Sequence, residues 1–419
     1  MRRLIALTLM LVPLLMGAKE KDGIKLAQLD KARETVWKEW CEKLAKEDTL
    51  PAFSTEALEK QNTMRWQLPG ELEPKAIMPF YSGTKGEKPE KGFPVFIYMH
   101  GSGPKDAEWT TGLKLAQVFD DAPSLYLVPQ IPNEGEYYRW WQKAKQWAWR
   151  HTLEKILSHP DVDPARIYMF GISEGGYGSQ RLASFYADYL AGAGPMAGGE
   201  PLRNAPAENL CQTAFSLITG ELDRGFYRNQ LTQRTKERLD SLKKLYPEEY
   251  NHRVMLEEGK GHAMTYTLTT PWLKQFRRKA QPKHFRWENY EMDGLKRNAF
   301  YNLEVLQEDT EERCDYEFDI QDNMVHLTVS EVKYIITERD LMYGIELNNT
   351  REYKDAPHGA VRIYLSEQLA DLKRPVKIFL NGRLVTTSRP QLKRTTLAQS
   401  CALFADPLRL FPACIEVKW

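Results

Sequence analysis

The sequence has almost no net charge and no long hydrophobic run. Lysine and arginine total 58 and aspartate and glutamate total 57, so the formal charge is +1. A chain this close to neutrality lacks the basic excess typical of proteins that bind nucleic acid or anionic membranes, and neither partner is predicted. The longest apolar run, residues 4–16, has about 13 residues and is short for a membrane span.

Motifs that hold metals and cofactors are also absent. The sequence contains no His-Glu-x-x-His, no cysteine–histidine cluster, no P-loop and no dinucleotide-binding fingerprint, so we predict chemistry that needs neither metal nor cofactor. Cysteine is scarce, with five residues and no Cys-x-x-Cys pair. Because the number is odd, at least one thiol stays unpaired within the chain, although a Cys401–Cys414 bridge is compatible with the sequence.

Residues 1–18 have the layout of a secretory signal peptide. Two arginines precede the apolar run, and the small residues Gly17 and Ala18 follow it, so cleavage is expected near Ala18. An uncleaved anchor is the alternative. We therefore expect a secreted or periplasmic protein with no stable membrane span after cleavage.

The periodicity of the chain changes near residue 280. Before it, continuous apolar runs such as Val95–His100 and Arg166–Phe170 alternate with helical patterns, which predicts an α/β fold with a doubly wound, mostly parallel sheet. After it, apolar and polar residues alternate with period two, and Asn381-Gly382 is a strong hairpin signal. The predicted units are a signal peptide (1–18), an N-terminal helical extension (19–60) that would dock on the main domain, an α/β domain (61–280) and a C-terminal antiparallel β-sandwich-like domain (286–419).

A serine lies between glycines where a predicted strand meets a predicted helix. Gly171-Ile172-Ser173-Glu174-Gly175 matches Gly-x-Ser-x-Gly, a pattern that makes a sharp turn and exposes the serine hydroxyl. A tight turn with an incidental serine is the alternative. The strand–turn–helix context favours Ser173 as a nucleophile.

Such a serine needs a histidine base and a carboxylate that orients the base. Five histidines follow it: His252, His262, His284, His326 and His358. Only His262 lies in a glycine-rich loop directly after an apolar strand, so we predict His262 as the base. In the loop after residues 214–220 we predict Asp223 as the acid, with Glu221 as the alternative.

Two backbone N–H groups are expected to bind the oxyanion that forms during acyl transfer. One is that of Glu174, directly after the serine, and the other is that of Ser102 or, alternatively, Gly101. These last two residues lie in the segment 100–103, which follows an apolar strand. His100 is expected to brace this loop by hydrogen bonds.

The segment 136–157 is rich in aromatic residues. Tyr138, Trp140 and Trp141 are candidates for a platform under a sugar ring or an aromatic acyl group, and burial in the core is an equally good interpretation. Glu200 is a candidate to line the pocket, with an ion pair to an arginine as the alternative.

Taken together, His-Gly-Ser-Gly (100–103), Gly-Ile-Ser-Glu-Gly-Gly (171–176), Thr-Gly-Glu-Leu-Asp (219–223) and Gly-Lys-Gly-His (259–262) resemble the α/β-hydrolase superfamily over roughly residues 60–280. Residues 162–179 are similar to its secreted esterase branch, which includes polyhydroxybutyrate depolymerases, feruloyl and acetyl-xylan esterases and prolyl-oligopeptidase-like hydrolases. The resemblance implies acyl hydrolysis through an acyl-enzyme with Ser173, Asp223 and His262 as a triad. The lid and specificity insertions of that family have no match here.

The expected substrate is a small-molecule or polysaccharide-linked ester of the acetyl or feruloyl type. One alternative is a serine peptidase of the prolyl-oligopeptidase-like type, which often carries a β-propeller that this chain lacks. The other is a non-catalytic glycan-binding protein, against which the complete Ser-Asp-His set argues. The sequence gives no indication of the oligomeric state.

Overall fold

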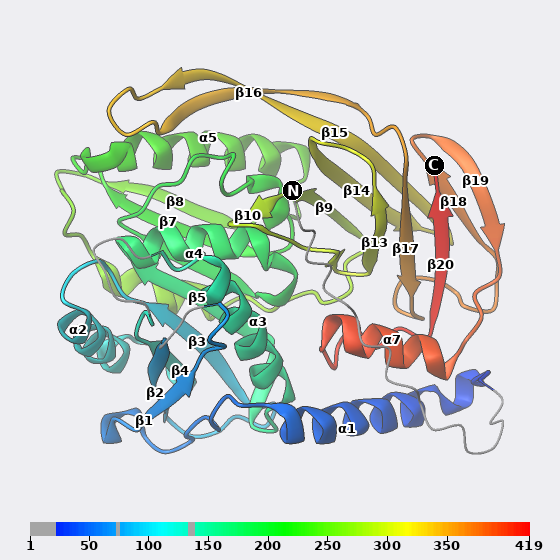
Figure 1. Cartoon of the computed structure of the whole chain (residues 1–419), viewed down its shortest axis with the longest axis horizontal. Helices are drawn as coiled ribbons and strands as arrows, with labels where there is room; N and C mark the ends of the chain where they lie inside the picture. Colours follow the sequence, from blue (N-terminus) through cyan, green and yellow to red (C-terminus); the bar gives the residue numbers. More distant parts are fainter. Residues whose placement is uncertain (1–21, 73–75, 133–138) are drawn as a thin grey trace.

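A computed structural model describes residues 22–72, 76–132 and 139–419 (Figure 1). The predicted signal peptide and Tyr138 lie outside the described residues. The first large sheet has eight strands in the order β1-β2-β4-β3-β5-β6-β7-β8. These strands are β1 (Thr63–Gln67), β2 (Ile77–Lys85), β3 (Phe93–Met99), β4 (Ser124–Pro129), β5 (Val162–Ile172), β6 (Gly192–Met196), β7 (Ala214–Gly220) and β8 (His252–Glu257).

The sheet is mostly parallel. β2 runs antiparallel to both β1 and β4, and every later neighbouring pair is parallel. Because parallel strands are joined by crossovers that place helices on the faces of a sheet, such strands are buried on both sides and read as continuous apolar runs. β3 is buried at every position, which explains why the sequence predicts it so clearly.

Helices cover both faces of this sheet. On one face lie α3 (Lys143–Ser158), α4 (Glu174–Phe185) and α5 (Arg228–Leu245), and on the other lie α2 (Lys105–Val118) and α6 (Thr269–Leu273). Alternate residues of β3 serve the two faces: Ile97 and Met99 pack with α3 and α4, whereas Phe96 and Tyr98 pack with α2 and α6. The period of two along each strand therefore divides one apolar run between two cores.

The C-terminal region contains two further sheets around a common hydrophobic core. One sheet is formed by β9 (His284–Asn289), β14 (Arg313–Gln321), β15 (Met324–Arg339), β16 (Glu346–Asp355), β18 (Val376–Leu380) and β19 (Arg383–Ser388), and the other by β12 (Ala299–Phe300), β13 (Leu303–Glu308), β17 (Gly359–Leu365) and β20 (Ala413–Lys418). A short hairpin joins β10 (Glu291–Met292) to β11 (Leu295–Lys296). The region is mainly antiparallel, as predicted, with one parallel pair, β15 and β18.

Tight turns close two of these hairpins. Asp322 and Asn323 join β14 to β15 with φ of 50° and 60°, and Asn381 and Gly382 join β18 to β19 with φ of 43° and 77°. Positive φ at both central residues is the geometry that matches the twist of a two-residue hairpin, and asparagine, aspartate and glycine tolerate it best.

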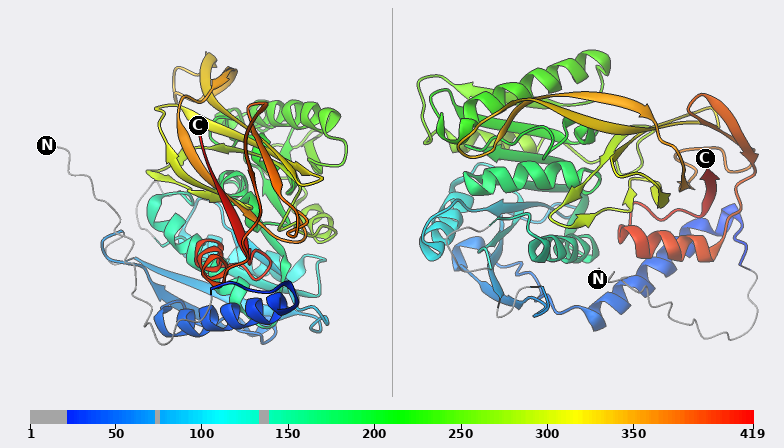
Figure 2. Two further views of the ribbon diagram at one scale, coloured as in Figure 1. Left: turned by 90° about the vertical axis from the view of Figure 1, so that its right-hand side faces the viewer. Right: turned by 45° about the horizontal axis from the view of Figure 1, so that its top comes forward.

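The N-terminal helix α1 (Leu29–Glu47) packs against α7 (Arg394–Phe404) rather than on the main domain alone (Figure 2). Its buried residues Leu29 and Val36 share a cluster with Leu397 and Cys401. The expectation of docking on the main domain is therefore incomplete. The apolar stripe of α1 packs on a helix about 360 residues later in the chain. Hydrophobic periodicity predicts that α1 has a buried face but not which element covers it.

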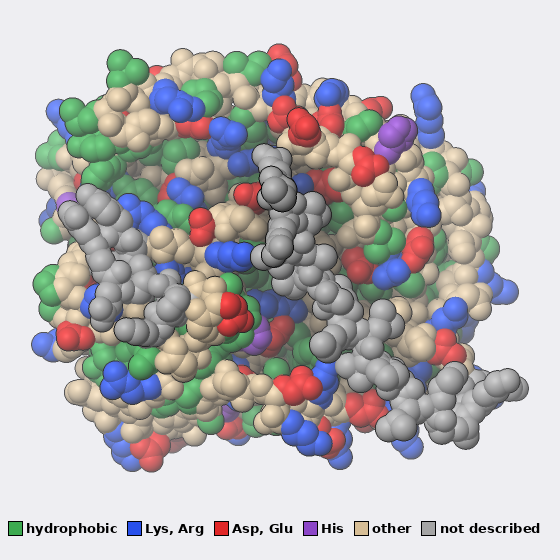
Figure 3. All heavy atoms as spheres, viewed as in Figure 1, with side chains coloured by type: hydrophobic (Ala, Val, Ile, Leu, Met, Phe, Trp, Pro, Cys, Tyr) green, Lys and Arg blue, Asp and Glu red, His purple; other side chains and the backbone are tan. Residues whose placement is uncertain are grey.

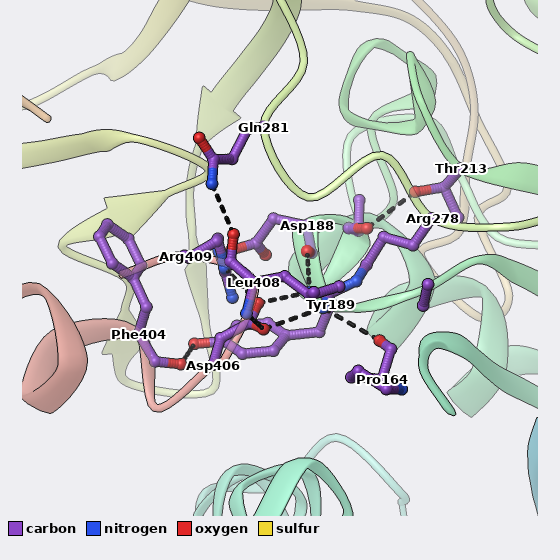
Figure 4. A network of polar contacts seen from close by, with 12 residues as sticks. Pro164, Asp188, Tyr189, Thr213, Arg278, Gln281, Phe404, Asp406, Leu408 and Arg409 are labelled. Carbon is purple, nitrogen blue, oxygen red and sulfur yellow. Dashed lines mark hydrogen bonds and ion pairs between the residues drawn. The ribbon is translucent and has the colours of Figure 1, made fainter. Parts of the chain in front are cut away.

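A buried ionic network joins the C-terminal region to the first sheet's region (Figure 4). Asp188 accepts hydrogen bonds from Arg409 at 2.6 Å and from Arg297 at 2.9 Å, and Asp406 accepts from Arg278 at 2.7 Å and from Arg409 at 2.6 Å. Burial would raise the pKa of Asp188, but Arg297 and Arg409 outweigh burial and hold it at about 2. The two regions are thus connected by buried ion pairs, in which removing either partner would leave an unpaired charge in the interior.

All five cysteines are free thiols, so Cys401 and Cys414 form no bridge. Within the described ranges, no helix has the length and apolar composition needed to cross a membrane.

Candidate active site

Ser173 occupies the turn between β5 and α4. Its φ of 57° and ψ of −113° are strained for a residue with a side chain. The glycines around it are needed because the backbone is closely packed here. A Cβ at Gly175 would lie 1.9 Å from the Met99 carbonyl oxygen, and a Cβ at Gly171 would lie 2.4 Å from the Gly175 carbonyl oxygen. The turn therefore passes too close to β3 for any residue but glycine at these positions.

Three predicted residues meet at this turn. Ser173 Oγ lies 3.0 Å from His262 Nε2, and His262 Nδ1 lies 2.7 Å from Asp223 Oδ2. Asp223 follows β7 and His262 follows β8. Parallel strands end at one edge of a sheet, so the loops that follow them converge there.

The structure separates the two candidate acids. Asp223 is 4% exposed and contacts the imidazole. Glu221 is exposed and accepts a hydrogen bond from the Gly259 N–H at 3.0 Å, so it ties the acid loop to the histidine loop. The extra two residues beyond the strand end turn Asp223, and not Glu221, toward His262.

The loop between β3 and α2 lies against the serine. A Cβ at Gly101 would be 3.3 Å from Ser173 Cβ and 3.3 Å from the Ile172 carbonyl oxygen. Gly101 therefore packs directly on the turn, whereas Ser102 is exposed. Glu174 begins α4, so its N–H belongs to the unpaired amides at a helix N-terminus.

His100 braces this loop. Its Nε2 accepts the Ile131 N–H at 3.1 Å, and its Nδ1 donates to the Gly101 carbonyl at 2.8 Å, which assigns the proton to Nδ1. Burial lowers the pKa of His100 to about 4, so the ring is neutral at neutral pH.

Trp140 is not a substrate platform, contrary to one interpretation of the sequence. Its side chain is 0% exposed, and its indole N–H donates to the His100 carbonyl at 3.1 Å. It packs on α4 at Gly178, where a Cβ would come within 2.6 Å of Trp140 Cβ. Trp140 supports the loop that carries Gly101.

Glu200 does not line a pocket either. It is 3% exposed, and Arg181 holds both of its oxygens, at 2.7 and 3.0 Å. The structure therefore shows the alternative that the sequence left open for Glu200, an ion pair with an arginine. Trp141 stays partly exposed, with the Arg181 guanidinium 3.9 Å from its ring centroid.

Two further side chains lie beside the triad. Arg228 Nη1 donates to Asp223 Oδ1 at 3.0 Å. The Glu174 side chain is 6% exposed, with one oxygen 3.3 Å from Arg139 Nη1 and the other without a hydrogen bond. Burial raises the pKa of Glu174 to about 7, against the opposing effect of Arg139. The sequence places Arg228 near the acid loop and leaves two interpretations open, pairing with a carboxylate and binding an acidic substrate; the structure shows the pairing. The burial of the Glu174 side chain was not predicted.

Cys211, Glu249 and His284 form the group of described residues that could hold a metal ion. They lie before β7, before β8 and at the start of β9, at the sheet edge opposite Ser173, beside a cavity of about 660 Å³. Glu249 lies 2.8 Å from Cys211 Sγ and 2.8 Å from His284 Nδ1. Burial opposes protonation of His284, but its hydrogen bonds to Cys211, Glu249 and Glu317 raise its pKa to about 12. The group is thus satisfied internally.

No family model matches this chain. Poly(3-hydroxyalkanoate) depolymerase C of Paucimonas lemoignei is 31% identical over 85 residues, which are 19% of this chain and 20% of the depolymerase. The chain thus spans about a fifth of the curated relative that it matches.

Solved structures that resemble the chain include esterases and a putative dipeptidyl aminopeptidase IV from Bacteroides ovatus. A thermostable esterase is 19% identical over 53% of this chain and 64% of its own, with a TM-score of 0.41. A ferulic acid esterase is 14% identical over 51% and 97%, with a TM-score of 0.39. An acetyl xylan esterase from Aspergillus awamori is 10% identical over 48% and 94%, with a TM-score of 0.35.

The assignment of the fold rests on the molecule itself. The strand order 1-2-4-3-5-6-7-8, the antiparallel second strand and the strained serine turn after β5 are all present. This chain has the α/β-hydrolase fold, followed by a β-rich C-terminal region.

Proposed function

We propose that the protein is a serine hydrolase that cleaves carboxylic esters through an acyl-enzyme. The observation that carries the proposal is the continuous chain of hydrogen-bond distances from Ser173 Oγ to His262 and from His262 to the buried Asp223. A serine hydroxyl is a poor nucleophile until a base takes its proton, and this arrangement supplies an oriented base.

In the first half-reaction, Ser173 Oγ attacks the ester carbonyl carbon while His262 Nε2 takes the hydroxyl proton. Asp223 holds the imidazole with its proton on Nδ1 and stabilises the imidazolium that forms. The carbonyl oxygen becomes an oxyanion, for which the N–H groups of Glu174 and of the Gly101–Ser102 segment are the proposed donors. The intermediate collapses, and the leaving alcohol takes the proton from His262 Nε2.

In the second half-reaction, water replaces the alcohol. His262 takes a proton from the water as its oxygen attacks the acyl carbon, and the proton returns to Ser173 Oγ when the carboxylic acid leaves. Each half-reaction uses the same base and the same oxyanion donors.

The substrate that we propose is a carbohydrate-linked ester of the acetyl or feruloyl type. Two observations support it. Structural neighbours include a ferulic acid esterase and an acetyl xylan esterase. Trp141 is partly exposed and is connected to the site through Arg139, which lies over its ring and contacts Glu174, so the part of this side chain that Arg139 and Arg181 leave exposed is available to a sugar near Ser173.

A fluorophosphonate probe tests the mechanism. The unmodified full-length protein should be labelled, and Ser173→Ala should not be labelled while keeping its melting temperature. Absence of labelling on well-folded unmodified protein would contradict the proposal. p-Nitrophenyl acetate and peptide p-nitroanilides then separate an esterase from a peptidase, and acetylated and feruloylated sugars test the substrate class.

We also propose export to the periplasm or the medium, on the charge and hydrophobicity of residues 1–18. N-terminal sequencing of the exported protein should begin near Lys19. An intact N-terminus on a membrane-bound protein would show an anchor instead.

A further inference from the structure

A thiol, an imidazole and a carboxylate meet where the hydrolase fold joins the C-terminal region. Cys211 and Glu249 belong to the loops that precede β7 and β8, and His284 is the first residue of β9. Cys211 Sγ lies 3.8 Å from His284 Nδ1, and Glu249 Oε2 lies 2.8 Å from each of these two atoms. One donor atom of each side chain therefore lies around a common point, although 73 residues separate Cys211 from His284.

These spacings are close to those of a tetrahedral zinc site. With Zn–S bonds of about 2.3 Å and Zn–N or Zn–O bonds of about 2.0 Å, tetrahedral geometry separates a sulfur from a nitrogen or oxygen ligand by about 3.5 Å. The observed distance between Cys211 Sγ and His284 Nδ1 is 3.8 Å. Glu249 lies closer to both because it is hydrogen-bonded to them. Its side chain would move away by about 0.5–0.7 Å to bind the same ion.

The residues around the group hold its donor atoms in place. His284 Nε2 lies 3.4 Å from Glu317 Oε1, and the Tyr246 ring is stacked on the imidazole with the centroids 4.9 Å apart. The Gln212 amide donates to Glu249 Oε1 at 2.9 Å. A histidine that binds a metal usually donates its other ring N–H to a carboxylate, which fixes the tautomer. Glu317 supplies that carboxylate, so the Nδ1 atom of His284 is presented to the metal.

The charges of the group also suit a divalent cation. A Cys211 thiolate and a Glu249 carboxylate together neutralise Zn²⁺, while the imidazole binds as a neutral ligand. The ion takes the place of the protons that these groups share in hydrogen bonds, and those protons pass to water. Lys279 and Lys283 line the neighbouring cavity. Because the complex carries no net charge, these lysines do not oppose its formation.

Sulfur and nitrogen donors set this group apart from other acidic places on the protein. Carboxylates are mixed with lysines and arginines over the face drawn in Figure 3, so a carboxylate alone says little about metal binding. Thiolate and imidazole ligands favour zinc over Mg²⁺ and Ca²⁺, which prefer oxygen. Cys211 is 1% exposed, whereas Glu249 and His284 line the cavity. An ion would therefore enter from the cavity.

We propose that Cys211, Glu249 and His284 bind a zinc ion, with water from the cavity as the fourth ligand. Because the ligands come from both regions, the ion stabilises the junction between the hydrolase fold and the C-terminal region. The polar network drawn in Figure 4 lies at the same junction, and its members Arg278 and Gln281 also line the cavity. The site is at the sheet edge opposite the triad and is independent of the proposed ester hydrolysis.

Cobalt substitution tests the site on the full-length protein. After treatment with EDTA and removal of the chelator, one Co²⁺ should bind per chain and give the ultraviolet band of thiolate-to-cobalt charge transfer, and Zn²⁺ should abolish the band by displacing Co²⁺. Cys211→Ser should lose the band and bind Zn²⁺ about 100-fold more weakly in a competition titration. The absence of a band in the unmodified protein, or its survival in Cys211→Ser, would overturn the inference.

Cys314→Ser is the matched control. Cys314 is also a free thiol and is also 1% exposed, but it lies on β14 and is not one of the proposed ligands. This variant should keep both the band and the affinity for Zn²⁺. An equal loss in the two cysteine variants would show that the loss at Cys211 is not specific, and the inference would be wrong.

Glu317→Gln decides the matter if Cys211→Ser does not fold. The variant keeps all three ligands and should keep the charge-transfer band, whereas its affinity for Zn²⁺ should fall about tenfold because the imidazole loses a charged partner. An affinity unchanged by this substitution would place the ion elsewhere and overturn the inference.

Melting temperatures give a second readout. Zn²⁺ should raise the melting temperature of the unmodified protein, since a ligand that binds the folded state stabilises it, and should not raise that of Cys211→Ser. An equal rise in both would show that the ion binds at another place. Labelling of Ser173 by a fluorophosphonate should not depend on Zn²⁺, so failure of the zinc site leaves the proposed function intact, and failure of the proposed function leaves the zinc site intact.

Discussion

Arg228 binds the oxygen of Asp223 that does not contact His262. Arg228 Nη1 lies 3.0 Å from Asp223 Oδ1, while Asp223 Oδ2 faces His262 Nδ1 at 2.7 Å. The carboxylate is thus held from both sides. A buried charge with two partners of fixed geometry orients the imidazole more strictly than one with a single partner.

Replacing Arg228 tests this positioning role. Arg228→Met should lower kcat about tenfold and change KM little, since only the orientation of Asp223 is released. Arg228→Lys should recover part of kcat. A loss confined to KM, or no rescue by lysine at equal melting temperature, would contradict the role.

Asp223→Asn should lower kcat by about 10⁴-fold, because an amide no longer imposes the tautomer that the base needs. Glu221→Gln is the control and should cost less than about tenfold, because it removes only the charge from a hydrogen bond between exposed loops and leaves an amide oxygen to accept it. Steady-state kinetics on p-nitrophenyl acetate measure both. The reverse order of effects would show that the acid is assigned incorrectly.

Ser173→Gly should stabilise the protein as it abolishes activity. Ser173 has a φ of 57°. This conformation costs conformational energy in a residue with a Cβ, whereas glycine adopts it without that cost. We expect the free energy of unfolding to rise by about 1 kcal/mol relative to Ser173→Ala, which keeps the strain. Urea unfolding measures the difference, and equal stability of the two variants would show that the turn is relaxed.

Glu174→Gln should change how stability depends on pH. Burial raises the Glu174 pKa from about 4.5 to about 7, so ionising this carboxyl group disfavours folding as pH rises between those values. The variant should match the unmodified protein at pH 4.5 and be more stable by about 3 kcal/mol at pH 8. Melting temperatures over this range test it, and a constant difference would exclude a titrating Glu174.

Arg409→Met should destabilise the whole chain. Arg409 is 0% exposed and contacts Asp188 and Asp406, so its loss leaves buried carboxylates short of a partner. We expect a loss of about 3–5 kcal/mol at pH 7. Arg394→Met, which breaks an exposed pair with Glu39, should cost less than about 1 kcal/mol. Equal losses of stability in the two variants would show that burial of the network does not increase its contribution to the free energy of unfolding.

The pH dependence of that network has a defined sign. The pKa of Asp188 lies below its ordinary value, so its pairing stabilises the protein at neutral pH, and this contribution is lost as pH falls from about 4 to about 2. Asp188→Asn should therefore lower the stability of the protein at pH 7 more than at pH 3. A penalty that does not depend on pH would show that Asp188 is uncharged in the folded protein.

Much of the fold could be predicted because it is encoded locally. Strand β3 reads as an apolar run since both of its faces are buried, and the turn at Ser173 needs glycine at 171 and 175 whatever lies further along the chain. The loops of Asp223 and His262 could be paired for a similar reason, because loops after parallel strands converge at one sheet edge.

The sequence by itself determined which residue types stand at each strand end, and hence a serine, a carboxylate and a histidine in order. Only the tertiary structure decided that Trp140 is buried against α4, that Glu200 pairs with Arg181, and that Asp340 meets Tyr227 across 113 residues. Local patterns encode backbone conformation and burial, whereas contacts between distant side chains depend on how whole elements pack.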